Sequence, residues 1–410
     1  MKCPNCDGTT IFEILNLGLQ PPSNALLSHV TEFAAELRYP LRLLQCLDCY
    51  LVHTEQVVTH TGLFNHNYPY MSGYSSIWRQ HCRDLVTELR RQFGLNGSSV
   101  VCEVAANDGT LLQMFEQFGA HLYGIEPTLS TARIAAGKGL RIYPIFLGRD
   151  TAIEILEGGE RSCDILVANN VLAHVPNLAD FVDGCKELLK PDGVAVFEFQ
   201  YLLNLIEHNQ FDTIYHEHFS YLTLGFVDAL FRERGLRLFD AERLPTHGGS
   251  LRVYATRSRA DLPQITRRLR NLLLRESRSP HLTPSGIEAF ASRVQSVAIE
   301  FRQFLESARD SGRVVAGYGA AAKGNTLLNF CQVDDTLMKY VVDENPAKQF
   351  KFLPGSHIKV VPSSVLDTDR PDFVVILPWN LAEEIQASCT WLRQRGVRLM
   401  TVIPEMRELN

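Results

Sequence analysis

The chain has 410 residues, of which 45% are hydrophobic and 21% are charged, and this composition indicates a globular protein of two or three domains. A net charge of −6 at pH 7 argues against general attraction to nucleic acid or anionic membranes, so we expect neither partner. No apolar run approaches the ~18–20 residues of a membrane helix, and the first residues, MKCPNCDGTT, show no signal-peptide core. We therefore expect a cytoplasmic protein.

Two CxxC pairs mark residues 1–65 as a small zinc-binding domain. Such a short segment buries little core without help, and cysteine pairs that converge on one metal ion supply that help. The predicted Zn²⁺ ligands are Cys3, Cys6, Cys46 and Cys49. Four thiolate ligands leave no open coordination position, so we assign the metal to folding. Two unrelated thiol pairs, or a redox pair, are the alternatives.

Residues 66–261 alternate between expected strands and helices, which predicts an α/β domain with a mostly parallel sheet covered on both faces. The first strand, helix and strand are expected in SVVCEVAAND, GTLLQMFEQFG and AHLYGIEP. A helix in STARIAAGKG follows, and CDILVANNVL, LADFVDGCKELLK and GVAVFEFQ continue the alternation.

The turn after the first strand has the character of a cofactor site. Small residues around Ala105, Asn107 and Asp108 let the backbone approach a ligand closely. Glu126 ends the second strand, where a carboxylate in doubly wound sheets accepts hydrogen bonds from a ribose. The turn lacks the G-x-G-x-x-G of dinucleotide sites, so S-adenosylmethionine, which has a ribose and no phosphate, fits better. A turn that only joins strand to helix is the alternative.

Two later stretches, CDILVANNVLAHVPNLADF and ELLKPDGVAVFEF, resemble motifs of class I methyltransferases. Together with the turn they predict a Rossmann-like domain that binds S-adenosylmethionine. The residues expected at this cofactor are Glu103, Ala105, Asn107, Asp108, Glu126, Pro127, Asn169 and Asn170.

Residues 262–312 are helical and rich in Arg, and we expect a bridge whose basic face is solvated. Residues 313–410 predict a second Rossmann-like α/β unit that begins with RVVAGYGAAAKGNTLLNF. Its Gly-rich turn points backbone amides at an anion, and Lys323 adds positive charge. A dinucleotide bound here would make the protein an oxidoreductase, which is the alternative interpretation.

In chain order, the motifs resemble those of the nucleotide-sugar C-methyltransferases. The matching stretches are the two CxxC pairs, LNLGLQPPSNAL, YPYMSGYSSIW, EVAANDGTLL, VLAHVPNL, YHEHFSYLTL, HGGSLRVY and GYGAAAKGNTLLNF. The resemblance implies a zinc domain, a class I methyltransferase domain, and a C-terminal domain that helps hold a nucleotide sugar. The best-known members of that family methylate C-3 of a thymidine-diphosphate 4-keto-6-deoxy sugar in deoxysugar biosynthesis. VAAND differs from the family's Gly-Ser-Asn-Asp, but alanine is also small.

The resemblance gives roles to the YHEH segment, residues 215–218. Methylation of a carbon beside a ketone needs a base to remove a proton and a partner for the enolate oxygen. By this resemblance, His218 is expected to be the base, and Glu217 is expected to orient or polarise it. Tyr215 is expected to donate a hydrogen bond to the substrate. His174 is expected to assist. The expected substrate-binding residues are Tyr70, Tyr74, His247, Lys323 and Asn325.

Several alternatives stay open at this point. YHEH is also compatible with a metal site or a plain polar turn, and His174 and His247 with structural histidines. The tyrosines of YPYMSGYSS are compatible with a domain-interface core. For the whole protein, the alternatives are a methyltransferase acting on a different natural-product acceptor and a non-catalytic zinc-stapled scaffold.

Overall fold

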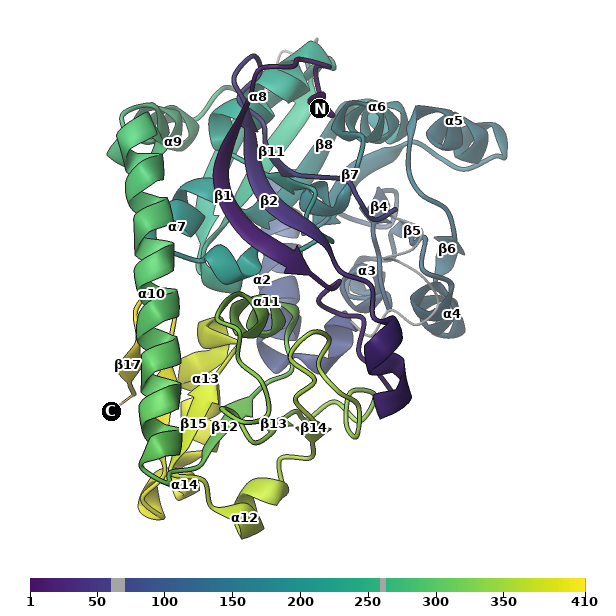
Figure 1. Cartoon of the computed structure of the whole chain (residues 1–410). Coiled ribbons are helices and arrows are strands. Elements are labelled where there is room, and N and C mark those ends of the chain that lie inside the picture. The colour runs from purple at the N-terminus through teal and green to yellow at the C-terminus, as the bar shows by residue number, and fades with distance from the viewer. Residues whose placement is uncertain (60–70, 259–262, 410) are drawn as a thin grey trace.

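The computed structural model describes residues 1–59, 71–258 and 263–409, which form three sheets with associated helices. Figure 1 shows the middle sheet at the top, the C-terminal sheet at the bottom, and the N-terminal strands crossing in front between them. The long helix α10 (Pro284–Asp310) runs along one side and connects the two larger parts.

The N-terminal part folds as an antiparallel sheet rather than as loops around a metal. Its strands are β1 (Ile11–Gln20), β2 (Tyr39–Cys46) and β3 (Val52–Thr54), with the short 3-10 helix η1 (Val30–Ala35) between the first two. The fourth strand is β9 (Ser220–Tyr221), which pairs with β3 although it lies far along the chain. The segment after YHEH therefore belongs to the N-terminal sheet.

The middle sheet has seven strands in the order β10-β11-β8-β7-β4-β5-β6, and its β4–β8 part is parallel, as the alternation predicted. Its edge strand β10 forms an antiparallel hairpin with β11, which in turn pairs antiparallel with β8. The strands are β4 (Val100–Val104), β5 (His121–Ile125), β6 (Arg141–Tyr143), β7 (Cys163–Asn169), β8 (Leu189–Gln200), β10 (Leu236–Leu244) and β11 (Ser250–Arg257). Because parallel strands share one direction, the carboxyl ends of β4, β5, β7 and β8 meet at one edge.

The helices of this part are α2 (Ser76–Phe93), α3 (Thr110–Gln113), α4 (Leu129–Gly137), α5 (Arg149–Glu157), α6 (Leu178–Leu188), α7 (Leu202–Glu207) and α8 (Leu224–Glu233). The helix predicted in GTLLQMFEQFG is divided into α3 and the 3-10 helix η3 (Glu116–Phe118). The Met114 amide bonds the carbonyls of both Leu111 and Leu112, which tightens the last turn and ends the α-helix early.

The C-terminal sheet has the order β14-β13-β12-β15-β16-β17, with the first five strands parallel. These strands are β12 (Val315–Tyr318), β13 (Val341–Val342), β14 (Val360–Val361), β15 (Phe373–Ile376), β16 (Arg398–Thr401) and β17 (Arg407–Glu408). The helices of this part are α11 (Ala322–Phe330), α12 (Val365–Asp369), α13 (Ala382–Ser388) and α14 (Thr390–Gln394), whereas α9 (Arg267–Ser277) packs against β10 and α8 of the middle part. This part also has a Rossmann-like strand order.

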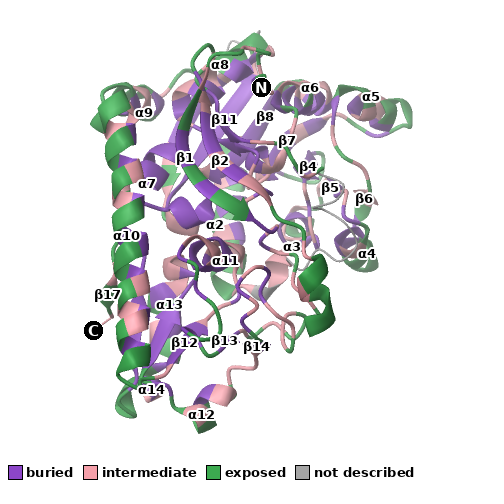
Figure 2. Ribbon diagram, viewed as in Figure 1, coloured by how far each residue is buried: buried purple, intermediate pink, exposed green. Residues whose placement is uncertain are grey.

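One hydrophobic core joins all three parts. It includes Leu43 of β2, Leu205 of α7, Phe301 of α10 and Leu328 of α11, all fully or almost fully buried. Figure 2 shows this buried strip between the middle sheet and the C-terminal helices. Since apolar burial is the main stabilising contribution, a shared core fixes the parts relative to one another.

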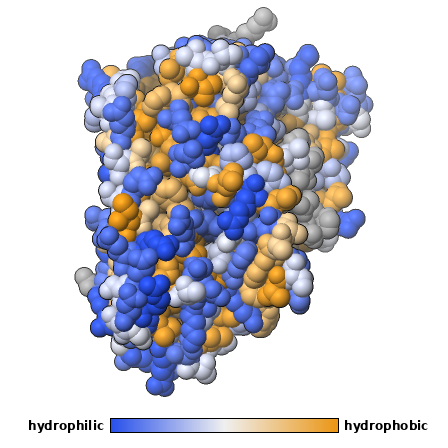
Figure 3. Space-filling view, in the orientation of Figure 1, coloured by the Kyte–Doolittle hydropathy of each residue, from blue (hydrophilic) through white to orange (hydrophobic). Residues whose placement is uncertain are grey.

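In the part of the chain that the structure describes, no helix is long and apolar enough to cross a membrane. The face seen in Figure 3 intersperses blue hydrophilic residues with orange hydrophobic ones.

Candidate active site

The four predicted zinc ligands converge at the N-terminus. The Sγ atoms of Cys3, Cys6, Cys46 and Cys49 all lie within 4.8 Å of one another. The Cys3–Cys49 and Cys6–Cys46 pairs are 3.6 Å apart, close to the ~3.8 Å edge of a tetrahedron with ~2.3 Å Zn–S bonds. The donor set therefore fits Zn²⁺.

Local turns bring these thiols together. The amide of Cys3 donates to the Gly8 carbonyl, and the amide of Cys46 donates to the Leu51 carbonyl, closing each CxxC loop. A Cβ on Gly8 would come within 2.2 Å of the Asp48 carboxylate and 3.1 Å of Cys6 Sγ, so a larger residue would displace the exposed Asp48 side chain. The sequence thus encodes both the ligands and the space they need.

The predicted cofactor turn has an unusual backbone. Ala105, Asn107 and Gly109 all have positive φ, near 58°, 50° and 76°. A Cβ on Gly109 would meet the Leu140 side chain at 2.4 Å, so both the conformation and the space call for glycine there. This turn connects β4 to α3 at the carboxyl edge of the sheet, where doubly wound domains bind ligands.

Glu126 is held rigidly at the end of β5. One carboxylate oxygen accepts the Asn107 amide at 2.9 Å and the other accepts the Thr128 amide at 2.8 Å. Each oxygen keeps a second lone pair for a ribose hydroxyl. Pro127 follows directly in the chain, so Glu126 has the place and acceptor capacity that the sequence predicted.

Glu103 and Asn169 leave polar atoms unsatisfied at the same edge. Glu103 Oε2 and both side-chain polar atoms of Asn169 are buried without a hydrogen-bond partner among the described residues. Burial raises the pKa of Glu103 well above its ordinary value. The Asn170 amide donates to the Glu198 carbonyl, which fixes the end of β7. Unsatisfied buried groups are costly, so their presence favours a polar ligand here.

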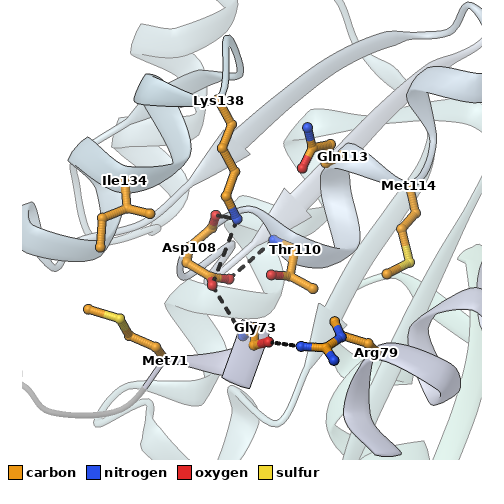
Figure 4. A pocket seen from close by; sticks show the side chains of 9 residues that line it. All are labelled: Met71, Gly73, Arg79, Asp108, Thr110, Gln113, Met114, Ile134 and Lys138. Atoms are coloured by element: carbon orange, nitrogen blue, oxygen red, sulfur yellow. Dashed lines mark hydrogen bonds and ion pairs between the residues drawn. The ribbon is translucent and has the colours of Figure 1, made fainter. Parts of the chain in front are cut away.

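Asp108, one of the residues expected at the cofactor, contacts the segment that precedes α2. Its carboxylate accepts hydrogen bonds from the Ser72 hydroxyl at 2.8 Å and the Gly73 amide at 3.1 Å. Lys138 donates to its backbone carbonyl at 2.6 Å. Figure 4 shows the contacts of Asp108 with Gly73 and Lys138 beside a cavity of about 700 Å³ next to the turn. Asp108 therefore anchors the segment that precedes α2, which supports the turn from outside.

His218 is held as a neutral imidazole. Its Nδ1 lies 3.0 Å from the Thr213 carbonyl, which can only accept, so Nδ1 carries the proton. Nε2 then accepts the Tyr215 hydroxyl at 2.9 Å. Burial is the main cause that lowers the pKa of His218 well below its usual value, and the neighbouring His174 imidazole, which would repel a second positive charge if it were protonated, adds to the effect. The orienting partner found on the ring is Thr213, where the sequence pointed to Glu217.

His174 and His247 are neutral as well. His174 Nδ1 donates to the Glu217 carbonyl at 2.7 Å, and its ring centroid lies 4.7 Å from that of His218. His247 packs near Trp78, with ring centroids 5.7 Å apart. Burial lowers the pKa of each to about 4.

The other two members of YHEH face the N-terminal part. Glu217 Oε1 accepts the Asn24 side-chain amide at 2.7 Å, and His216 Nε2 donates to the Pro40 carbonyl at 3.2 Å. Thr54 Oγ1 donates to the His218 carbonyl at 2.8 Å. YHEH is thus an anchored segment rather than a free polar turn.

Lys323 and Asn325 come from the start of α11 in the C-terminal part. Lys323 Nζ donates to Asn380 Oδ1 at 2.6 Å, and its charge contributes to the low pKa of both His218 and His247. Both side-chain polar atoms of Asn325 are buried without a partner in the described chain. Tyr70 and the side chain of Tyr74 lie outside the described residues.

Sequence reasoning missed Asn24 and Thr54. Asn24 lies in LNLGLQPPSNAL, and the match of this stretch to the family was a usable signal. Thr54 carries no such signal, because its role depends on the pairing of β3 with β9.

Comparisons with known proteins cover the whole chain. A C-methyltransferase C-terminal domain model matches residues 245–404, a methyltransferase domain model matches 76–240, and a zinc binding domain model matches 3–64. The C-methyltransferase NovU of Streptomyces niveus is 31% identical over 411 residues, 100% of this chain and 97% of that protein. A ubiquinone biosynthesis O-methyltransferase of Rhodopseudomonas palustris is 32% identical over 26% of this chain and 44% of that enzyme.

Among solved structures, the magnesium protoporphyrin IX methyltransferase ChlM from Synechocystis with bound SAH is 15% identical. It matches 44% of this chain and 83% of that chain with a TM-score of 0.35. Full-length similarity to NovU, with the three domain models in one chain, shows that this protein belongs to the C-methyltransferase family and is an S-adenosylmethionine-dependent enzyme.

Proposed function

We propose that the enzyme methylates a carbon beside the ketone of a nucleotide-activated keto-deoxysugar, through an enolate, in deoxysugar or natural-product biosynthesis. The observation that carries this proposal is the neutral imidazole of His218, whose Nε2 is the basic nitrogen and accepts the Tyr215 hydroxyl. A carbon acid needs such a base, and a neutral histidine is ready to take the proton at neutral pH.

The proposed roles follow from the surrounding contacts. His218 removes the proton, while Tyr215 and the ammonium of Lys323 stabilise the negative charge on the enolate oxygen. S-adenosylmethionine supplies the methyl group, and we assign its ribose to Glu126 and its polar groups to Asn169 and the turn around Asn107. The C-terminal part, with the unsatisfied Asn325, is proposed to hold the nucleotide diphosphate.

Methyl transfer to a panel of nucleotide-linked 4-keto-6-deoxy sugars tests the proposal. We expect S-adenosylhomocysteine, a methylated sugar, and exchange of the adjacent carbon's proton in deuterated water. Cofactor binding with neither product nor exchange would contradict the sugar assignment and favour a different acceptor.

His218→Asn tests the base directly. We expect this variant to bind cofactor as the wild type does while kcat falls by at least about 100-fold, the scale of a lost general base. Isothermal titration and a product assay measure the two quantities. His208→Asn, at an exposed position, serves as the matched control. Full turnover by the His218 variant would refute the assignment.

A further inference from the structure

A buried carboxylate stands at the boundary between the YHEH segment and the C-terminal part. Asp212 belongs to the 3-10 helix η5 (Phe211–Thr213), directly before YHEH, and its residue exposure is 0%. One carboxylate oxygen accepts the Trp379 indole N–H at 2.7 Å. The other oxygen is buried and has no hydrogen-bond partner among the described residues. Burying a carboxylate with one unsatisfied oxygen costs folding free energy, and this cost indicates a functional reason for the residue.

Trp379 reaches this carboxylate from the other side of the boundary. It begins the 3-10 helix η8 (Trp379–Leu381), after β15 of the C-terminal sheet. A Cβ on Gly248 would lie 2.2 Å from the indole ring, so the ring rests directly on the backbone beside His247. The indole is therefore wedged between the two parts, with its N–H aimed at Asp212.

Lys323 lies on the same indole. Its Nζ is 4.7 Å from the centre of the Trp379 ring, a cation–π distance, and the neighbouring Asn380 accepts its hydrogen bond. Asp212, Trp379 and Lys323 thus form a chain of contacts that runs from the start of YHEH to the start of α11.

Charge explains why the carboxylate and the ammonium occur together. Burial raises the pKa of Asp212 to about 7, and the positive charge of Lys323 opposes that rise. Burial also lowers the pKa of Lys323, and Asp212 opposes that fall. Each group therefore favours the charged form of the other. An ammonium drawn from water without such a partner would tend to lose its proton.

We propose that Asp212 is a positioning residue. Through the indole of Trp379 it holds Lys323 as an ammonium near His218 and His247, at the boundary between the YHEH segment and the C-terminal part. The inference rests on the proposed function, since an ammonium placed there stabilises the enolate oxygen as the base withdraws its proton. Asp212 itself does not contact the reacting atoms in this account.

Three substitutions separate this role from a merely structural one. Asp212→Asn retains an oxygen for the indole N–H and removes the charge, while Trp379→Phe retains the ring and removes the N–H. Lys323→Met removes the ammonium. We expect Asp212→Asn to lower kcat by about 100-fold, the scale of a misplaced catalytic group, with an unchanged KM for S-adenosylmethionine.

The double variant Asp212→Asn/Lys323→Met is expected to be no slower than Lys323→Met alone, because Asp212 is proposed to act only by positioning the Lys323 ammonium. Glu306→Gln on α10 is the matched control, since it removes the carboxylate of an exposed ion pair with Arg302. Additive losses in the double variant, or a loss seen only as a lower melting temperature, would overturn the proposal.

A second measurement does not need turnover. The ¹H–¹⁵N indole resonance of Trp379, assigned by its absence in Trp379→Phe, is expected to shift in Asp212→Asn and in Lys323→Met, and to stay in place in Glu306→Gln. A shift without activity on any sugar of the panel would support the contact chain while the proposed function fails. A resonance that responds to neither substitution would overturn the inference, whatever the activity.

Discussion

At the residue scale, burial sets the chemistry of the histidines. His174, His218 and His247 are partly buried, and burial lowers the pKa of each, which keeps them neutral at physiological pH. A backbone carbonyl then fixes the tautomer of His174 and of His218, so that Nε2 is the basic nitrogen in both. A defined tautomer presents one ring nitrogen as the proton and hydrogen-bond acceptor.

The same burial predicts a pH dependence of stability. The unfolded pKa of His is ~6.5, whereas that of folded His247 is about 4, so the folded state binds fewer protons between these values. Its contribution is present above pH ~6.5 and lost as the pH falls towards 4. The contribution of Asp212 to stability depends on pH in the opposite sense. Burial raises its pKa to about 7, so the stability it contributes at low pH is lost as the pH rises towards 7.

His247→Asn isolates the histidine contribution. Asn tolerates the positive φ of 54° at this position, so the change removes the titration without backbone strain. We expect the loss of unfolding free energy between pH 7.5 and pH 5 to be smaller in the variant by about 1–2 kcal/mol. Urea unfolding at both pH values measures it, and an equal loss in both proteins would contradict the assignment.

At the element scale, the two-residue strand β9 fixes the YHEH segment. Its pairing with β3 places Thr54 next to the His218 carbonyl, and the Thr54 amide bonds the neighbouring Phe219 carbonyl. The N-terminal sheet therefore holds the YHEH segment, to which we assign the proposed base, in register.

Thr54→Val tests this element. The substitution keeps the side-chain shape and removes the hydroxyl that donates to the His218 carbonyl. We expect kcat to fall by roughly tenfold, because a lost hydrogen bond of ~1.4 kcal/mol in the transition state has that effect. Steady-state kinetics measure it. Thr87→Val, where an exposed hydroxyl bonds within α2, is the control. Equal kcat in the two variants would show that β3 does not position His218.

Much of the fold and part of the candidate site could be predicted from the sequence, for reasons that differ from one element to the next. Strand–helix alternation predicted β4 through β8, since burial on both faces leaves a local apolar pattern. The cysteines were predictable from their spacing alone. The contacts of Asp212 with Trp379, and of Thr54 with His218, were not, because they join residues more than 160 positions apart. A single sequence carries no local pattern for such pairs.

At the scale of the whole molecule, all three parts of the chain contact residues 212–218, which comprise Asp212 and the YHEH segment. Asn24 contacts Glu217 from the N-terminal part, Trp379 contacts Asp212 from the C-terminal part, and His174 contacts the segment from the middle part. The site is a property of the assembled chain rather than of the methyltransferase sheet alone.

Zinc removal is expected to act through this assembly. Without the metal, the N-terminal sheet loses its closing link, because structural zinc binding contributes directly to folding. We expect a Cys49→Ser variant, or chelated protein, to lose turnover while it still binds S-adenosylmethionine at the turn after β4. Metal analysis, titration calorimetry and a product assay measure these effects.

Cys389→Ser is the control, because that cysteine lies in the C-terminal part, far from the four ligands in sequence. Unaltered turnover in a zinc-free sample would show that the metal does not influence the YHEH segment.

The pairing of β3 with β9 also constrains how the protein can be made. Val52 leaves the ribosome about 170 residues before its partner Tyr221. At ~5–20 residues per second, the nascent N-terminal sheet waits roughly 8–34 s with an open edge. During synthesis that edge is a site for mispairing, so slow translation before β9 or a chaperone on the nascent chain would change the yield of active enzyme.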